Sequence, residues 1–184
     1  MLFQWEVLTE EQLSHIQTID HAATKLSRLN HSLLLLTKIE NRQFEYDEEI
    51  DFKPLIEAQL KELDEFTHLQ KITVQNQIDH SKIVRMNPVL ADVMLRNLLT
   101  NAIRYCSKPG TIQISLEQSQ LVIANTGAPL KIRDGQIFDR FKKDQQLSDS
   151  LGLGLSIVKK ICELYNFQIE YDYQNNYHSF KIIL

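Results

Sequence analysis

The most constraining feature of the sequence is a stretch from Thr9 to Glu40 that contains neither glycine nor proline. Its start, Thr9-Glu10-Glu11-Gln12, fits a capping box, in which the threonine and glutamine side chains each bond the other's backbone N–H. Apolar residues then recur at alternating spacings of three and four, which predicts one long helix with an apolar seam. The seam consists of Ile19, Ala22, Leu26, Leu29, Leu33 and Leu36.

A single helix cannot bury this seam. Leu34 and Leu35 widen it beyond the seam of a two-stranded coiled coil, as a helical bundle requires. We therefore expect the helix to pack against a second copy of the chain or against a helix outside this sequence. The alternative is that the helix folds back on its own domain.

Composition excludes several classes of protein. The chain has 184 residues, 43% of them apolar, and a formal net charge of −4. The mild acidity argues against nucleic acid or an anionic membrane as a partner, since both require a basic surface. Cys106 and Cys162 form no Cys-x-x-Cys pair, which argues against a disulfide scaffold and a thiolate zinc site and favours a reducing compartment. With no apolar run of membrane-spanning length and no signal-peptide pattern, we expect a cytoplasmic α+β protein.

Beyond the long helix, helix and strand patterns alternate. Pro54 suits the first position of a helix that runs to Phe66, and Asn87 suits the N-cap of a helix that begins at Pro88. A third helix is expected at 151–165. Strands are expected at 50–52, 71–78, 82–85, 111–116, 121–124, 167–173 and 177–184. Residues 127–150 are expected to form a long loop, and a loop of that length within a compact domain is usually functional.

Two asparagines stand four positions apart in the segment Asn97-Leu-Leu-Thr-Asn101-Ala102. This spacing places both side chains on one helical face. Their amide groups can bind a hydrated cation or phosphate oxygens without adding negative charge. Two solvated surface asparagines would give the same pattern.

A second polar position ends an apolar strand, in Leu121-Val-Ile-Ala-Asn125-Thr126-Gly127. A side chain at the end of a strand can contact the edge of a nucleotide base, and the glycine lets the backbone turn. An ordinary strand-to-turn Asn-x-Gly is the alternative.

Two more motifs flank the end of the long loop. In Ile137-Phe138-Asp139-Arg140-Phe141-Lys142-Lys143, two aromatic residues can anchor a loop that presents cations, or can simply form a small apolar cluster. In Leu151-Gly152-Leu153-Gly154-Leu155-Ser156, two glycines open a helix whose free N–H groups can bind phosphate. Neither the Rossmann glycine fingerprint nor the classical phosphate-loop motif is present.

In this order and spacing, the four motifs resemble those of the ATP-binding domain of two-component sensor histidine kinases. These kinases lie within the wider gyrase, chaperone and mismatch-repair ATPase superfamily. Asn97 to Ala102 resembles the N box, Asn125 to Leu130 the first glycine box, Phe138 to Phe141 the F box, and Gly152 to Leu155 the second glycine box. The resemblance covers about residues 50–184. The segment upstream is similar to the second helix of the family's dimerisation and phosphotransfer hairpin.

The resemblance implies a two-layer α/β sandwich, in which a mixed, mostly antiparallel sheet carries about three helices on one face. One long helix would precede it. We therefore expect a helical dimerisation segment at 1–43 and an ATP-binding kinase domain at 44–184.

The resemblance also implies roles for individual residues. Asn101 would ligate the Mg²⁺ that bridges the nucleotide phosphates, with Asn97 nearby, and oxygen ligands of this kind suit Mg²⁺. Lys143 matches a cation that approaches the γ-phosphate, within a lid formed by Lys142 to Leu151. The full set of implied ATP contacts is Asn97, Asn101, Arg104, Tyr105, Asn125, Gly127, Leu130, Phe141, Lys143, Gly152, Leu153, Gly154 and Leu155.

The sequence departs from the family pattern at two positions of the first glycine box. Asn125 stands where aspartate is common, and its amide oxygen can still accept a hydrogen bond from the adenine amino group, without a charge. Pro129 replaces the second glycine of this box and is expected to stiffen the entry to the lid. ATP binding is therefore expected to survive.

The larger departure is that the phosphoacceptor box is absent. None of the six histidines is followed by an acidic residue, so all six are interpreted as surface or packing residues. We expect the chain to be the C-terminal piece of a longer sensor kinase, which would itself be cytoplasmic or have a membrane anchor. A natural short form is the alternative.

The function implied by the resemblance is an ATP·Mg²⁺-binding kinase module that transfers the γ-phosphoryl group to a histidine, without autophosphorylation in cis. Its partners would be a second copy, through the long helix, and a response-regulator receiver domain. The alternative is a nucleotide-sensing regulatory module without kinase activity. A stand-alone ATPase is disfavoured because no glutamate in the segment 97–102 is available to activate water.

Overall fold

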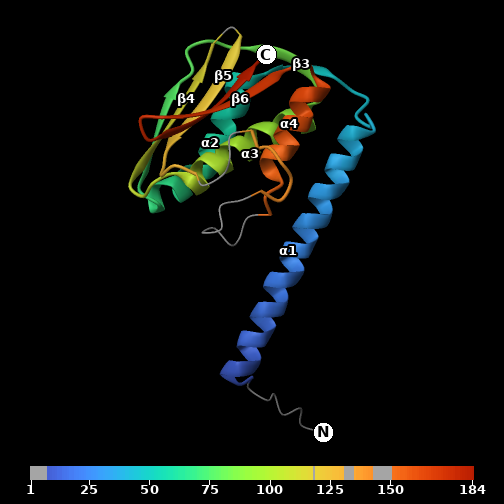
Figure 1. Ribbon diagram of the computed structural model, residues 1–184, viewed down its shortest axis with the longest axis vertical. Coiled ribbons are helices and arrows are strands. Elements are labelled where there is room, and N and C mark those ends of the chain that lie inside the picture. The colour runs from blue at the N-terminus through green and yellow to red at the C-terminus, as the bar shows by residue number, and fades with distance from the viewer. Residues whose placement is uncertain (1–7, 118, 131–134, 143–150) are drawn as a thin grey trace.

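The computed structural model describes residues 8–117, 119–130, 135–142 and 151–184 (Figure 1). The long helix α1 (Glu10–Glu40) leads into a domain whose described residues form three helices and seven strands. In chain order these are β1 (Glu48–Asp51), α2 (Phe52–Leu69), β2 (Ile72–Gln77), β3 (Ile83–Met86), α3 (Pro88–Tyr105), β4 (Gly110–Leu116), β5 (Gln120–Thr126), α4 (Gly154–Leu164), β6 (Gln168–Gln174) and β7 (Tyr177–Ile183).

Five strands form the main sheet, in the order β2-β4-β5-β7-β6. Only β2 and β4 pair in parallel, whereas the other pairs are antiparallel. Helices α2, α3 and α4 cover one face of this sheet, and the core lies between the two layers (Figure 1). The predicted fold class is confirmed.

A second sheet, made of β1 and β3, was not expected from the sequence. Strands β2 and β3 follow one another in the chain, yet they join different sheets. Hydrophobic alternation identifies a strand but does not identify its pairing partner.

Helix α1 has the predicted capping box, because Thr9 Oγ1 accepts from Gln12 N while Gln12 Oε1 accepts from Thr9 N. The helix projects away from the domain, and only its C-terminal part packs against α4 (Figure 1). Leu36 and Ile39 are buried there, whereas Ile19 and Leu26 are 67% and 65% exposed. The helix therefore folds back on its own domain over its last third and leaves the rest of the seam uncovered.

Two predicted helix boundaries were wrong by a few residues. Helix α2 begins at Phe52 rather than Pro54, because Asp51 caps it by accepting a hydrogen bond from Lys53 N. Proline is tolerated there because first-turn N–H groups have no partner within the helix. Helix α4 begins at Gly154 rather than Leu151, because Gly152 has a φ of +68°, which a right-handed helix excludes.

Candidate nucleotide site

A pocket lies where α3, the ends of β5 and β7, and the start of α4 meet. Residues from all four predicted motifs contribute to it. It is lined by Asn97, Thr100, Asn101, Arg104, Tyr105, Asn125, Leu130, Ile137, Lys142, Gly152, Gly154, Leu155, His178 and Phe180. The pocket thus combines amides, cations, bare backbone and apolar side chains.

One end of the pocket is formed by α3 and the start of α4. Asn97 Nδ2 donates to the carbonyl oxygen of Val93 at 2.8 Å, which leaves the amide oxygen facing Gly154. A Cβ atom added to Gly154 would lie 2.7 Å from Asn97 Oδ1, so a larger residue here would require the Asn97 amide to move. Among the described residues, no side chain caps the N-terminus of α4. Its free N–H groups and positive dipole end can therefore bind an anion.

Gly152, two residues before α4, contacts the backbone of the F-box segment. Its carbonyl oxygen accepts a hydrogen bond from Phe141 N at 2.8 Å. An added Cβ atom at Gly152 would lie 2.8 Å from the carbonyl oxygen of Lys142 and from the carbonyl carbon of Phe141. This close contact places Lys142 at the pocket.

The other end of the pocket contains a fully buried amide. Asn125 Nδ2 donates to the Thr126 carbonyl oxygen at 3.2 Å, whereas Asn125 Oδ1 has no hydrogen-bond partner within the described residues. A buried acceptor without a partner lowers folding stability by about 1–3 kcal/mol. A bound ligand with a hydrogen-bond donor at this position would pair with Asn125 Oδ1 and remove that cost.

His178 lies directly opposite Asn125 in the β5–β7 register and is 2% exposed. Its Nε2 lies 2.9 Å from the Ala128 carbonyl oxygen, and its Nδ1 lies 2.8 Å from the Tyr171 hydroxyl. Burial lowers the pKa of His178, and this exceeds the opposing effect of the Ala128 carbonyl. The ring is therefore neutral at pH 7.

Nine of the predicted contacts lie at the pocket. Three others do not line it, because Gly127 packs against the His178 ring, Leu153 is buried in the core, and Phe141 is 58% exposed. Lys143 lies outside the described residues.

Sequence reasoning missed five lining residues, namely Thr100, Ile137, Lys142, His178 and Phe180. The position of Thr100 between the two asparagines, and the tandem Lys142-Lys143, were available signals. For His178 and Phe180 the sequence offers no signal, because the pairing of β7 with β5 brings them to the site. His178 is a packing residue, as predicted, and it also lines the pocket.

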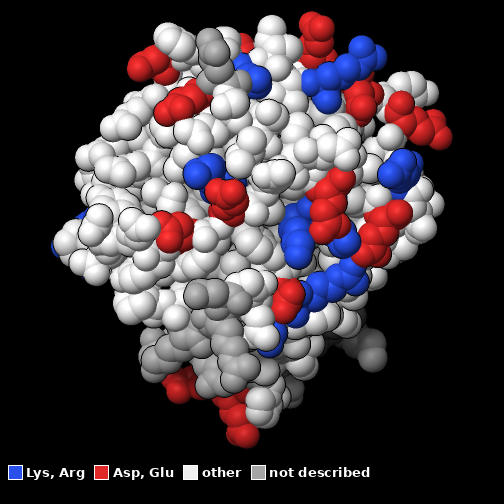
Figure 2. Space-filling view, turned by 45° about the horizontal axis from the view of Figure 1, so that its top comes forward, with Lys and Arg blue, Asp and Glu red and all other residues white. Residues whose placement is uncertain are grey.

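The described residues contain no cluster of His, Cys, Asp and Glu that could hold a metal ion. None of their helices is both long enough and apolar enough to span a bilayer. On the face seen in Figure 2, Lys and Arg side chains lie among Asp and Glu side chains. An ion at the pocket would therefore depend on amide oxygens and on the groups of its own ligand.

Comparison with known proteins identifies the family. The model of the histidine kinase-, DNA gyrase B- and HSP90-like ATPases matches residues 86–182. Sensor histidine protein kinase HK06 of Streptococcus pneumoniae is 34% identical over 180 residues, which cover 92% of this chain and 40% of that protein. The chain thus spans about two fifths of the length of this relative.

Solved structures of histidine kinases share the fold. AdeS of Acinetobacter baumannii is 25% identical with a TM-score of 0.75, over 96% of this chain and 84% of that one. Histidine kinase ThkA, in complex with response regulator protein TrrA, is 23% identical with a TM-score of 0.69, over 97% of this chain and 52% of that one. The motifs, the pocket and these matches together place the chain in the histidine kinase-, DNA gyrase B- and HSP90-like ATPase family, among the relatives of sensor histidine kinases.

Proposed function

We propose that this chain binds ATP with Mg²⁺ in the pocket between α3, α4 and the ends of β5 and β7, as the kinase module of a two-component system. The observation that carries the proposal is the buried Oδ1 of Asn125, which has no hydrogen-bond partner among the described residues and lies at one end of the pocket. The N-terminus of α4, which no described side chain caps, forms part of its other end. A purine base and a polyphosphate chain need these two environments.

The base would contact Asn125. Because Asn125 Nδ2 is already bonded to the Thr126 carbonyl oxygen, only the acceptor Oδ1 is available to a ligand. Adenine carries an amino group at the position where guanine carries a carbonyl oxygen. The carbonyl would face Oδ1 with a second acceptor, so the site is expected to prefer adenine.

The phosphates would lie between α3 and the start of α4. Lys142 and Arg104 line the pocket and supply positive charge, and the free N–H groups of α4 add fixed dipoles. The amide oxygens of Asn101 and Asn97 fit Mg²⁺, which keeps several waters and takes its remaining ligands from substrate phosphates. When bound, the ion would neutralise the charge on the phosphate oxygens.

The proposed reaction is phosphoryl transfer to an imidazole. The bond between the γ-phosphorus and the β–γ bridging oxygen breaks, a bond from that phosphorus to an imidazole nitrogen forms, and ADP leaves. The groups of this chain would act by positioning and by stabilising charge. The acceptor would be a histidine other than the six in this sequence, since none of the six is followed by an acidic residue.

The exposed seam of α1 supports self-association as part of this function. Ile19 and Leu26 of the seam are each about two thirds exposed along a helix that projects from the domain (Figure 1). A bundle with a second copy would bury them. We further propose a response-regulator receiver domain as a partner and a cytoplasmic location.

Calorimetric titration of the chain with ATP, with and without Mg²⁺, tests the binding proposal. We expect ATP to bind, more tightly with Mg²⁺ than without it, and Asn101→Ala to lose this gain from the ion. The matched control is Asn30→Ala, an exposed asparagine on α1, which should behave like the wild type. Absence of heat with ATP at millimolar concentration would overturn the proposal.

A transfer assay separates a kinase from a nucleotide-sensing module. The chain is incubated with labelled ATP·Mg²⁺ and a separate phosphoacceptor hairpin from a sensor histidine kinase relative. A kinase labels the hairpin and not itself, and a hairpin whose acceptor histidine is replaced by glutamine controls for adventitious label. ATP binding without label on the hairpin would favour the regulatory module.

A further inference from the structure

We infer that His178 is a positioning residue for the base of the nucleotide, because it holds the turn that carries Asn125 and Leu130. This inference rests on the proposed ATP site. It concerns a side chain on β7, outside the four motifs that identify that site.

The backbone register places the imidazole beneath the base end of the pocket. Asn125 and His178 are direct cross-strand partners, and Tyr173 on β6 is the partner of His178 on its other side. Directly paired residues project from the same face of a sheet, so these three side chains stand in a row. Asn125 and His178 both line the pocket and are almost fully buried.

The ring supports the turn from below. Its Nε2 lies 2.9 Å from the carbonyl oxygen of Ala128, which can only accept a hydrogen bond, so Nε2 carries the proton. Nδ1 is then the acceptor for the Tyr171 hydroxyl, 2.8 Å away. Both nitrogens of the neutral ring are therefore paired, and this fixes its tautomer and orientation.

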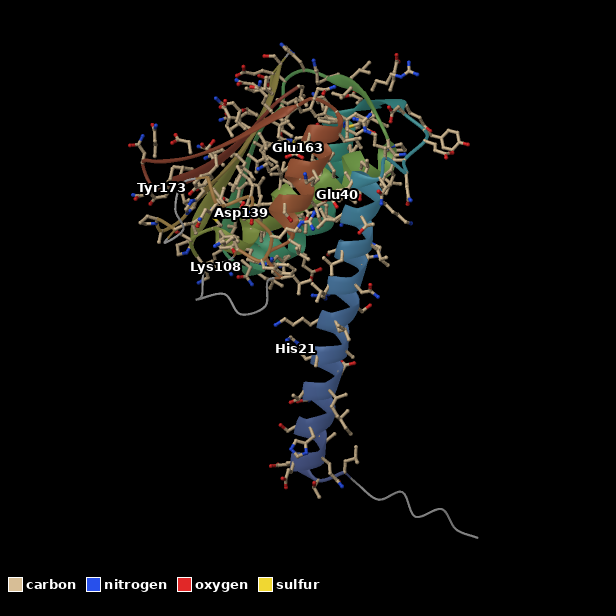
Figure 3. All side chains as sticks on the ribbon, turned by 45° about the vertical axis from the view of Figure 1, so that its right-hand side comes forward. His21, Glu40, Lys108, Asp139, Glu163 and Tyr173 are labelled. Atoms are coloured by element: carbon tan, nitrogen blue, oxygen red, sulfur yellow. The ribbon has the colours of Figure 1, made fainter. Side chains whose placement is uncertain are left out.

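Gly127 lets the turn approach the ring. A Cβ atom at Gly127 would lie 2.6 Å from His178 Cδ2 and 2.7 Å from His178 Nε2. The Tyr173 hydroxyl donates to the Gly127 carbonyl oxygen at 3.1 Å, and the Tyr173 ring centroid lies 4.7 Å from that of His178. Tyr173 lies near the tip of the β6–β7 hairpin (Figure 3). Two successive carbonyl groups of the turn are thus held from β6 and β7.

This arrangement connects His178 to base recognition. The turn leaves β5 one residue after Asn125 and reaches Leu130, and both of these residues line the pocket. If Ala128 is not held, the backbone between them gains freedom, which must be lost again when a base binds. His178 therefore pre-organises the acceptor and the apolar wall that the base contacts.

The test compares His178→Met with His178→Gln. Methionine fills the space without a donor, whereas the glutamine amide nitrogen can replace Nε2 as a donor to Ala128. The affinities for ATP·Mg²⁺ and for GTP·Mg²⁺ are measured by calorimetric titration. We expect the methionine variant to bind ATP about tenfold more weakly than the wild type, and its ratio of ATP affinity to GTP affinity to be smaller. The glutamine variant should stay within about twofold of the wild type.

Ile182→Val is the matched control. Ile182 lies on the same strand, is fully buried in the core and does not line the pocket. We expect it to lower thermal stability while leaving both nucleotide affinities unchanged. If His178→Met does not fold, Tyr173→Phe tests the same turn, because it removes the bond to Gly127, and it should weaken ATP binding about threefold.

The outcomes separate the two proposals. If the wild type does not bind ATP, the proposed function fails. If the wild type binds ATP and the methionine variant has the same affinity and the same preference, the role of His178 fails. Equal loss in the methionine and glutamine variants would also overturn it, because donation to Ala128 would then be irrelevant to binding.

Discussion

Glu40, the last residue of α1, forms an ion pair with Arg140, which lies two residues before the pocket residue Lys142. The two side chains are 100 positions apart in the sequence, and each is 41% exposed. The pair joins the end of the projecting helix to the loop that contributes Lys142. The side chains of α1 are therefore in direct contact with the loop that lines the candidate site.

The stability contributed by this pair is expected to be small. Exposed ion pairs contribute about 0.2–1 kcal/mol, because water and salt screen them. Arg140→Gln should therefore lower the free energy of unfolding by no more than about 1 kcal/mol in urea titrations, and by less in high salt. The double variant Glu40→Arg with Arg140→Glu should restore it, and a loss in the double variant equal to the sum of the single losses would contradict a direct pair.

The buried end of α1 should matter more to stability than its exposed seam. Leu36 is 1% exposed within the core, so Leu36→Ala removes buried methyl groups and leaves a cavity. We expect a loss of about 3 kcal/mol in the free energy of unfolding, measured by urea denaturation at low protein concentration. A loss below about 1 kcal/mol would mean that α1 does not pack on α4 in solution.

The matched variant is Leu26→Ala, on the same helix but 65% exposed. It should leave the stability of the dilute chain nearly unchanged and weaken self-association in sedimentation equilibrium. If Leu26→Ala sediments like the wild type at all concentrations, the seam is not the contact between copies.

The residues that sequence could identify are those whose role is local. The capping box of α1, Asn87 at the start of α3 and the asparagine spacing on α3 follow from neighbours within four positions, and the structure has each of them. Of the nine predicted residues that line the pocket, seven belong to short motifs, and Arg104 and Tyr105 follow the asparagine motif on the same helix. Local chemistry thus gave the elements and most of the pocket.

What the sequence could not reveal depends on pairing between distant segments. His178 reaches the pocket only because β7 pairs with β5, and alternation along β7 is the same whichever strand it joins. The separate β1–β3 sheet and the ion pair between Glu40 and Arg140 have the same origin. Phe141 was expected at the pocket, but its positive φ of 61° accompanies a side chain that is largely exposed.

Two glycines with positive φ should respond differently to alanine. Gly152 has a φ of +68°, and an added Cβ atom would lie 2.8–2.9 Å from backbone atoms of Phe141 and Lys142. Gly152→Ala therefore combines left-handed strain with a backbone clash, and should cost more than about 1 kcal/mol of stability. Because Lys142 must move, we expect ATP affinity in calorimetric titration to fall at least tenfold.

Gly135 is the control for this effect. Its φ is +85°, yet no atom of the described residues lies within 4 Å of an added Cβ position. Gly135→Ala should lower the free energy of unfolding by about 1 kcal/mol, the cost of the left-handed backbone alone, and should leave ATP affinity unchanged. Equal loss of affinity in both variants would indicate that backbone strain, and not the contact with Lys142, disturbs the site.

The pH dependence of stability should reveal the buried imidazole. Burial lowers the pKa of His178 in the folded chain below its ordinary value of 6.5. Well above pH 6.5 the ring is neutral in both the folded and unfolded states, so it contributes no pH dependence. As the pH falls through 6.5 the unfolded chain takes up a proton that the folded chain does not, so stability falls, by at most about 1.4 kcal/mol per pH unit. The decline ends below the folded pKa, where both states hold the proton.

The measurement is the free energy of unfolding in urea, for the wild type and for His178→Gln, between pH 5 and 8. Subtracting the values of the variant from those of the wild type cancels the contributions of the other titrating groups. We expect this difference in the free energy of unfolding to be constant above pH 7 and to fall below pH 6.5, where the wild type loses stability relative to the variant. A difference that stays constant over the whole range would mean that His178 has the same pKa in the folded and unfolded states.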